Sequence, residues 1–254
     1  MIALVREVSP CLADCELSFL PRVPIDAERA FRQHGAYVAE LAALGLGIEW
    51  LAPLATHADG VFVEDTAVVL PEVAVVTRPG VASRREEVST AAEALGTHRR
   101  LLRIVDPGTL EGGDVVRIDR TLYVGASGRS NAAGIQQLAR ALEPFDYRVR
   151  SVEMRDCLHL KSAATFVPPD ILIANPAWVD PGSFAAKRVI EVAPGEEFAA
   201  NTLTVAGVTF VSAAFPETER RLQAAGIATR ALDVSELQKA EAALTCLSLI
   251  LDQA

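Results

Sequence analysis

The chain has 254 residues, half of them apolar and only 6% aromatic, with a formal net charge of −9. No stretch concentrates Lys and Arg, so we expect no nucleic-acid partner. No apolar run approaches the roughly 18 residues of a membrane helix, and the first residues lack signal-peptide features, so we expect no membrane partner and a cytoplasmic location. The acidic balance suits a cationic small molecule.

Helix signals recur at similar intervals along the chain. Asp26 is a suitable N-cap, apolar residues follow at helical spacing, and Gly45 provides a stop. The same reading predicts helices over residues 26–44, 83–95, 130–143 and 216–226, a weaker one after Ser183, and a short one from Ser235.

Pairs of apolar strands separated by turn residues lie between these helices. The expected hairpins cover residues 61–63 and 66–70 with 73–77, 115–118 with 122–124, 166–167 with 171–174, and 203–205 with 208–211. Each hairpin precedes a helix signal and then another apolar strand, such as residues 48–51 or 227–232. Residues 243–251 read as a final buried strand that contains Cys246.

The elements form a β-β-α-β unit that is used about five times with a period of roughly 45 residues. Repeats of this size predict a closed array or propeller, in which the C-terminal strand completes the unit begun at the N-terminus. An open α/β sheet with irregular hairpins is the alternative. No change in composition indicates a linker, so residues 1–254 are expected to form one domain.

Polar residues recur where each repeat begins, and a closed ring would bring them together at its axis. They are Glu64 and Asp65, the stretch Glu111-Gly112-Gly113-Asp114, His159 with Lys161, Asn201, and Cys246. Singly, each has a plainer interpretation: a surface pair, a tight turn, a core histidine, a small core thiol. Their shared position in the repeat favours a common site, because buried charges and thiols in one place usually serve chemistry.

These residues resemble a known family. The motifs Phe62-Val63-Glu64-Asp65-Thr66, Thr77-Arg78-Pro79-Gly80, Ser83-Arg84-Arg85, Glu111-Gly112-Gly113-Asp114, His159-Leu160-Lys161-Ser162 and Leu244-Thr245-Cys246 look like those of dimethylarginine dimethylaminohydrolases, in the guanidino-group-modifying (pentein) superfamily. The resemblance spans nearly the whole chain. It implies a five-bladed α/β propeller, a pentein, with a central active site.

The resemblance also implies roles for individual residues. Cys246 would be the nucleophile, His159 the general acid and base, and Glu111 the carboxylate that orients His159 and the guanidinium. Asp65 would hold the guanidinium nitrogens. The remaining positions that would shape the site and bind the amino-acid end of the substrate are Asp59, Glu64, Arg84, Arg129, Leu17 on a covering loop, and Ala240 through its backbone carbonyl.

The implied reaction is hydrolysis of Nω-methylated arginine to citrulline and a methylamine through a covalent thiouronium, with no metal and no organic cofactor. Nearby carboxylates do not favour a thiolate, so we expect Cys246 to ionise only when the cationic substrate arrives. Lys161 stands where relatives that act on unmodified guanidinium usually carry Asp, which favours methylated substrates. The alternatives are another guanidine hydrolase or deiminase of this fold and a non-catalytic binding propeller.

The sequence departs from the family pattern in two places. Glu241-Ala242-Ala243 stands where the family often has Asp-Gly-Gly, which predicts a more crowded approach to the thiol. The N-terminal loop, residues 10–17, matches poorly. The sequence is compatible with a homodimer.

Overall fold

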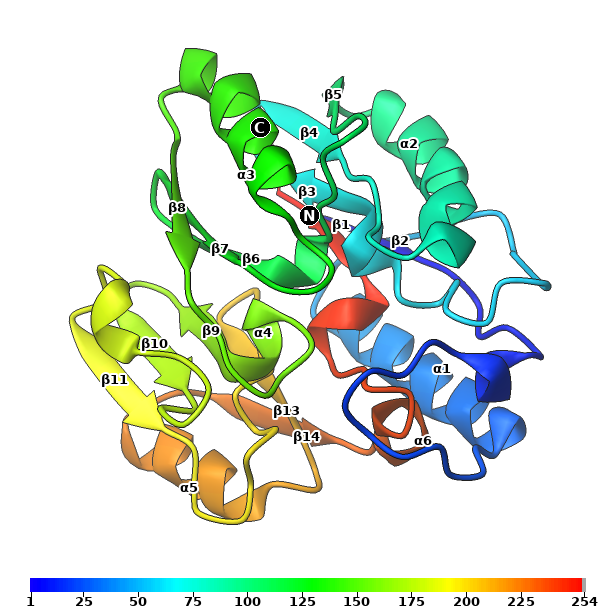
Figure 1. The fold of residues 1–254 in the computed structure, drawn as a ribbon. Helices are drawn as coiled ribbons and strands as arrows, with labels where there is room; N and C mark the ends of the chain where they lie inside the picture. The colour runs from blue at the N-terminus through cyan, green and yellow to red at the C-terminus, as the bar shows by residue number, and fades with distance from the viewer. Residues whose placement is uncertain (253–254) are drawn as a thin grey trace.

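The computed structural model describes residues 1–252, whose strands form five three-stranded sheets set around a central axis (Figure 1). Each sheet contains one antiparallel strand pair and one parallel pair. Within the described residues, no helix has the length and apolar character that crossing a membrane requires.

The first sheet joins the two ends of the chain. Strand β1 (Ile2–Val5) pairs antiparallel with β15 (Leu249–Leu251) and parallel with β2 (Gly47–Trp50). Helix α1 (Ala27–Ala43) links β1 to β2, and the Asp26 side chain caps it by accepting a hydrogen bond from the Arg29 amide. The C-terminal strand therefore closes the ring, as the repeat predicted.

The other four repeats are consecutive segments of the chain, each with one three-stranded sheet and its connections. The second contains β3 (Ala67–Val69), β4 (Val73–Val76), α2 (Val88–Gly96) and β5 (Arg100–Arg103). The third contains β6 (Val115–Ile118), β7 (Thr121–Gly125), α3 (Ala132–Leu142) and β8 (Arg148–Val152). The fourth contains β9 (Ala164–Val167), β10 (Ile171–Ala174) and β11 (Arg188–Glu191), and the fifth contains β12 (Leu203–Val205), β13 (Val208–Ser212), α5 (Pro216–Ala224) and β14 (Thr229–Leu232).

Short helices lie at the starts of the repeats and in the connections. Those that reach the axis are η2 (Val63–Thr66), η4 (Gly112–Asp114), α4 (Leu160–Ala163) and η7 (Thr245–Leu247). The others are η1 (Leu12–Asp14), η3 (Ala82–Glu87), η5 (Glu143–Phe145), η6 (Pro181–Ser183) and α6 (Ser235–Gln238).

Three element predictions were wrong in detail. The expected strand at residues 61–63 is a turn leading into η2, and residues 245–247 form η7, so the last strand covers only Leu249–Leu251. Both stretches are buried on all sides, so their apolar character did not reveal a turn. The helix expected after Ser183 does not form. Only the short η6 lies just before it, where the Asp180 side chain accepts a hydrogen bond from the Gly182 amide and stabilises a local turn.

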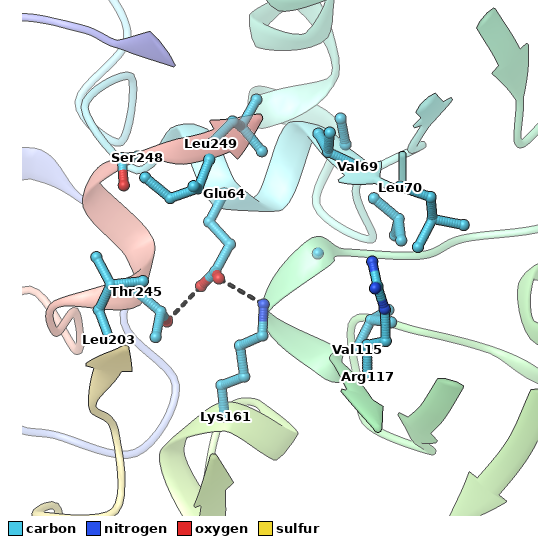
Figure 2. A pocket seen from close by; sticks show the side chains of 14 residues that line it. Glu64, Val69, Leu70, Val115, Arg117, Lys161, Leu203, Thr245, Ser248 and Leu249 are labelled. Carbon is cyan, nitrogen blue, oxygen red and sulfur yellow. Dashed lines mark hydrogen bonds and ion pairs between the residues drawn. The ribbon is translucent and has the colours of Figure 1, made fainter. Parts of the chain in front are cut away.

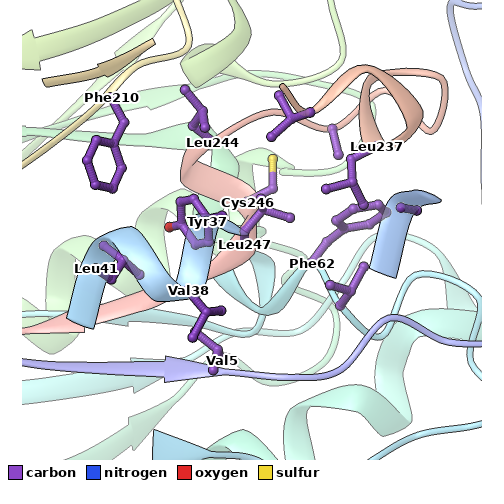
Figure 3. Close-up of a cluster of buried hydrophobic side chains, with 14 of the residues drawn as sticks. Val5, Tyr37, Val38, Leu41, Phe62, Phe210, Leu237, Leu244, Cys246 and Leu247 are labelled. Carbon is purple, nitrogen blue, oxygen red and sulfur yellow. The ribbon is translucent and has the colours of Figure 1, made fainter. Parts of the chain in front are cut away.

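The apolar cores bring the repeat starts together. Figure 3 shows the cluster that backs η7, in which Tyr37, Phe62 and Leu247 lie near the base of Cys246 and Phe210 lies farther away in the same cluster. At the axis η2 contacts both η4 and η7, and η4 contacts α4. The segments that carry Asp65, Glu111, His159 and Cys246 therefore meet, although as many as 181 residues separate two contacting side chains there, Glu64 and Thr245.

Candidate active site

The repeat starts enclose a small buried cavity of about 20 Å³, room for roughly one water molecule. Its wall combines a thiol, an imidazole, carboxylates, guanidinium groups and apolar side chains. The lining residues are Glu16, Asp59, Phe62, Asp65, Arg84, Arg129, Leu158, His159, Ala240, Glu241, Ala242 and Cys246. This conformation is closed, because the volume is far smaller than an amino acid.

Cys246 lies in η7 with 8% of its surface exposed. The Ala243 amide donates a hydrogen bond to Sγ at 3.4 Å. Burial, followed by the nearby Glu64 and Asp65 carboxylates, raises the pKa of the Cys246 thiol far above its ordinary value. The thiol is therefore neutral near pH 7, in agreement with the expectation from sequence.

His159 immediately precedes α4 and faces the carboxylates of the neighbouring repeats. Its Nε2 lies 2.7 Å from Glu111 Oε2 and 3.9 Å from Asp65 Oδ1. Burial lowers the pKa of His159, but Asp65, Asp114 and Glu111 outweigh it and raise the pKa to about 9. The imidazole is consequently protonated at neutral pH and can donate a proton.

The two glycines after Glu111 let the repeats approach closely. A Cβ on Gly112 would lie 2.0 Å from the Glu64 carbonyl oxygen, and one on Gly113 would lie 2.8 Å from both Asp65 Oδ1 and His159 Nδ1. The Gly113 amide also donates to Asp65 Oδ1 at 3.0 Å. Because these two glycines have no side chains, η4 packs directly against Glu64, Asp65 and His159.

Asp114 holds the residue that follows His159. Its carboxylate accepts hydrogen bonds from the Leu160 amide at 3.1 Å and from the hydroxyls of Ser127 and Ser130. Burial raises the pKa of Asp114 to about 6 despite these bonds. This contact ties the start of α4, and with it the position of His159, to η4.

Arg84 is buried and committed to carboxylates. It bonds Asp65 Oδ2 at 2.8 Å and Glu87 Oε2 at 3.0 Å. His159 and Arg84 overcome the effect of burial on Asp65 and lower the pKa of that carboxyl to about 2. Asp65 is therefore ionised and fixed in orientation.

Arg129 and Asp59 are buried side chains that line the cavity. Arg129 Nη1 is 3.6 Å from Glu111 Oε1, and its Nη2 donates to Ser18 Oγ at 3.2 Å. Asp59 Oδ2 accepts from the Glu16 amide at 3.1 Å. Both side chains therefore contact the N-terminal loop, which in the structure extends over residues 10–22.

Asp65, Glu111 and His159 each offer a ligand atom, and these atoms lie within 4.8 Å of one another. They could geometrically hold a cation. The same side chains already bond one another, Arg84, and the amides of Gly80 and Gly113. The three form an internally paired polar cluster.

A family model described as N,N dimethylarginine dimethylhydrolase, eukaryotic, matches residues 22–173. The N(G),N(G)-dimethylarginine dimethylaminohydrolase of Streptomyces coelicolor is 40% identical over 97% of this chain and 95% of its own. The enzyme of the same name from Pseudomonas aeruginosa is 31% identical over 88% of this chain and 89% of its own. The chain belongs to the dimethylarginine dimethylaminohydrolase family.

Solved structures agree with this membership. The dimethylarginine dimethylaminohydrolase of Pseudomonas aeruginosa, a cysteine-to-serine variant complexed with citrulline, matches with a TM-score of 0.91 over 97% of both chains at 29% identity. The N-terminal domain of ArgZ, at 20% identity and a TM-score of 0.88, shares the fold. The predicted family, five-bladed pentein fold and hydrolase class are confirmed.

In this dimethylarginine dimethylaminohydrolase family member, seven of the ten residues predicted for the site line the cavity: Asp59, Asp65, Arg84, Arg129, His159, Ala240 and Cys246. Glu111 is fully buried behind His159. Leu17 packs against the apolar core, and its neighbour Glu16 lines the cavity. Glu64 points into a second pocket, where Lys161 and Thr245 bind its carboxylate (Figure 2).

Sequence reasoning missed two side chains that hold the site. Glu87 binds Arg84 from three residues away, a spacing that places two side chains on one face of a helical turn. Glu241 has a left-handed backbone with φ of 56°, and its carboxylate accepts the amides of Ser18, Phe19 and Leu20. The only signal for Glu241 was its departure from the Asp-Gly-Gly pattern.

The Glu241 contacts close the N-terminal loop over the cavity, and they yield a prediction. Replacing Glu241 with Ala removes the acceptor for three amides. Together these hydrogen bonds stabilise the closed loop by about 2 kcal/mol of free energy. We expect trypsin to cut after Arg22 roughly thirtyfold faster in Glu241→Ala, with no change in Glu28→Ala, whose exposed carboxylate makes only a long ion pair with Arg32. Equal cleavage rates in Glu241→Ala and the unaltered protein would show that other contacts hold the loop.

Proposed function

We propose that this protein hydrolyses Nω-methylated arginine to citrulline and methylamine or dimethylamine. The observation that carries the proposal is the convergence of a neutral thiol, a protonated imidazole and ionised Asp65 on one buried cavity, in a chain of this family. Water, a cationic guanidinium and these protein groups suffice for the chemistry, and the partner is a small guanidino amino acid.

Binding uses charges of the opposite sign at both ends of the substrate. Asp65 holds the guanidinium nitrogens, each charged hydrogen bond contributing roughly 1.5–3 kcal/mol. Glu111 acts from behind His159, where it orients the imidazole. Asp59 and Arg129 take the ammonium and carboxylate of the amino-acid end, with the Ala240 carbonyl as a further acceptor. Both charged residues bind the N-terminal loop in the closed form, so ligand entry requires that loop to open.

The reaction then proceeds through a covalent intermediate. Arrival of the cation stabilises the Cys246 thiolate, and the thiol proton leaves to solvent. The thiolate attacks the central guanidinium carbon, and His159 gives its proton to the departing methylamine as the carbon–nitrogen bond breaks. Neutral His159 next removes a proton from water, whose oxygen attacks the thiouronium. The carbon–sulfur bond then breaks, the hydroxyl proton passes to the Cys246 sulfur to restore the thiol, and citrulline is released.

Lys161 supports a methylated substrate. Its ammonium pairs with Glu64 at 2.5 Å, so that carboxylate is engaged away from the cavity and grips no guanidinium nitrogen. A guanidinium held by fewer carboxylates leaves room for N-methyl groups. The nearest alternative remains a guanidine hydrolase or deiminase for another guanidino acid.

The test is a citrulline-release assay with dimethylarginine, monomethylarginine, arginine and agmatine. We expect turnover of both methylated arginines, with kcat/KM at least about tenfold above arginine, and negligible turnover of agmatine, which lacks the carboxylate that Arg129 binds. If arginine or another guanidine is turned over and dimethylarginine is not, the proposed substrate is wrong. Inactivity on all four, with no labelling of Cys246 by an amidine electrophile, would favour a binding protein.

A further inference from the structure

A second polar cluster lies on the same segments as the nucleophile and the acid–base residue. Lys161 Nζ lies 2.5 Å from Glu64 Oε1, and Thr245 Oγ1 donates to Glu64 Oε2 at 2.5 Å. Asn201 completes the cluster, because its Nδ2 donates to Thr245 Oγ1 and its Oδ1 accepts from the Thr245 amide, both at 3.1 Å. Figure 2 shows Lys161 rising from α4 toward Glu64, with Thr245 on the other side.

The cluster joins the three segments that carry the chemistry. Lys161 follows His159 by two residues in α4, Glu64 precedes Asp65 in η2, and Thr245 precedes Cys246 in η7. A shift of the Lys161–Glu64 pair would therefore move all three segments relative to one another. Reaction rates are sensitive to such shifts, because a displacement of about 1 Å can cost a hundredfold.

The cluster borders a different space from the site. Lys161, Glu64 and Thr245 line a pocket of about 210 Å³, and neither Cys246 nor His159 reaches it. The Glu64 side chain is 9% exposed and that of Lys161 is 22% exposed. The pair is therefore largely shielded from water. Two charges in such a partly buried environment interact more strongly than they would on the protein surface.

The two charges act on the thiol in opposite directions. Burial is the largest influence on Cys246, and Glu64 then raises the pKa of the thiol, whereas Lys161 lowers it. Lys161 thus offsets part of a carboxylate field that opposes thiolate formation.

We propose that Lys161 is a positioning residue for the nucleophile, which neutralises Glu64 and through Thr245 holds Cys246 where a thiolate can form and attack. This inference rests on the proposed function for its place in catalysis. Its electrostatic part concerns the thiol alone and is tested without turnover.

The experiment compares Lys161→Met, Glu64→Gln, the double variant and Lys161→Arg. Arg230→Met is the matched control, because it removes a distant cation that pairs with Glu40. Iodoacetamide labelling of Cys246 is followed by mass spectrometry of the tryptic peptide after Lys239, which contains no other cysteine. Rates are measured between about pH 7 and 10, alongside thermal unfolding and kcat with dimethylarginine.

Opposite shifts are expected from the two single variants. Lys161→Met should slow labelling at least about tenfold, which corresponds to one pKa unit, and Glu64→Gln should accelerate it. The double variant should label at nearly the unaltered rate. Lys161→Arg should keep the unaltered rate within about threefold, as should Arg230→Met. Turnover should fall in Lys161→Met mainly through kcat and recover in Lys161→Arg.

Three outcomes would overturn the proposal: unchanged labelling in Lys161→Met, slower labelling in both single variants, or an equal effect of Arg230→Met. The second outcome would mean that the pair acts only through folding. If the unaltered protein labels as expected but hydrolyses no methylated guanidine, the proposed function fails while the electrostatic role of Lys161 stands.

Discussion

Replacing Cys246 with serine is expected to lower kcat/KM for methylated arginine at least about a thousandfold. A hydroxyl in this position ionises far less readily than a thiol, and the adjacent His159 is already protonated, so it cannot remove the hydroxyl proton. Folding should be preserved, since serine is smaller and the Ala243 amide retains an acceptor. Thermal unfolding and citrulline release measure the two effects.

Cys11→Ser is the matched control for this prediction. Cys11 lies outside the cavity, and its thiol forms hydrogen bonds with Ser9 Oγ and the Ala55 carbonyl, which a hydroxyl can also bind. Its activity should stay near that of the unaltered protein. Mass spectrometry of stopped reactions should detect the covalent adduct on Cys246 in the Cys11→Ser variant and not in Cys246→Ser. Activity within tenfold of the unaltered protein in Cys246→Ser would rule out a thiolate nucleophile.

Replacing His159 with glutamine is expected to lower kcat between about a hundredfold and ten thousandfold, because both proton transfers lose their carrier. Glutamine retains a hydrogen-bonding group toward Glu111 but does not titrate. The remaining activity should depend on the leaving group, with poorer amines affected most.

The pH dependence separates this role from a structural one. Because the pKa of His159 is raised to about 9, its protonated form dominates below that pH and disappears above it. In the substrate complex the thiol has already ionised, so kcat of the unaltered protein should fall as pH rises through about 9, and kcat of His159→Gln should lack this decline. The value of kcat/KM also requires loss of the thiol proton in the free protein, so it should rise with pH and level off above about 9. The same sign applies to stability: the contribution of His159 is complete below about pH 6.5 and is lost as pH rises through 9. A decline near pH 9 that persists in His159→Gln would assign it to another group.

Much of this site follows from the sequence because repetition carries information about space. Five similar units of comparable length can bury their apolar faces by closing into a ring, and equivalent positions then share one axis. The polar residues at the repeat starts were thus expected to meet, and Asp65, His159 and Cys246 do line one cavity. Family motifs added roles that spacing alone did not supply.

The repeat pattern did not predict the directions in which individual side chains point. Glu64 and Asp65 are adjacent and equally acidic, yet Asp65 faces Arg84 and His159 whereas Glu64 faces Lys161 and Thr245. The difference arises because η2 is a short helix, and successive residues on a helical turn point in different directions. The predicted strands covered residues 61–63 and 66–70 and left Glu64 and Asp65 between them, so the sequence did not show which carboxylate enters the cavity.

The closed loop was also decided by tertiary contacts. Glu241 and the amides of residues 18–20 lie more than 220 positions apart in the chain, and no local rule pairs them. Sequence reasoning assigned the chain to a five-bladed propeller with Cys246 and His159 at its centre, because the repeat period and the chemical type of each residue can be read from the order of residues alone. Orientation, the Lys161–Glu64 pair and the loop held by Glu241 emerge only when distant segments pack, because each depends on which atoms come within hydrogen-bonding distance in the folded chain.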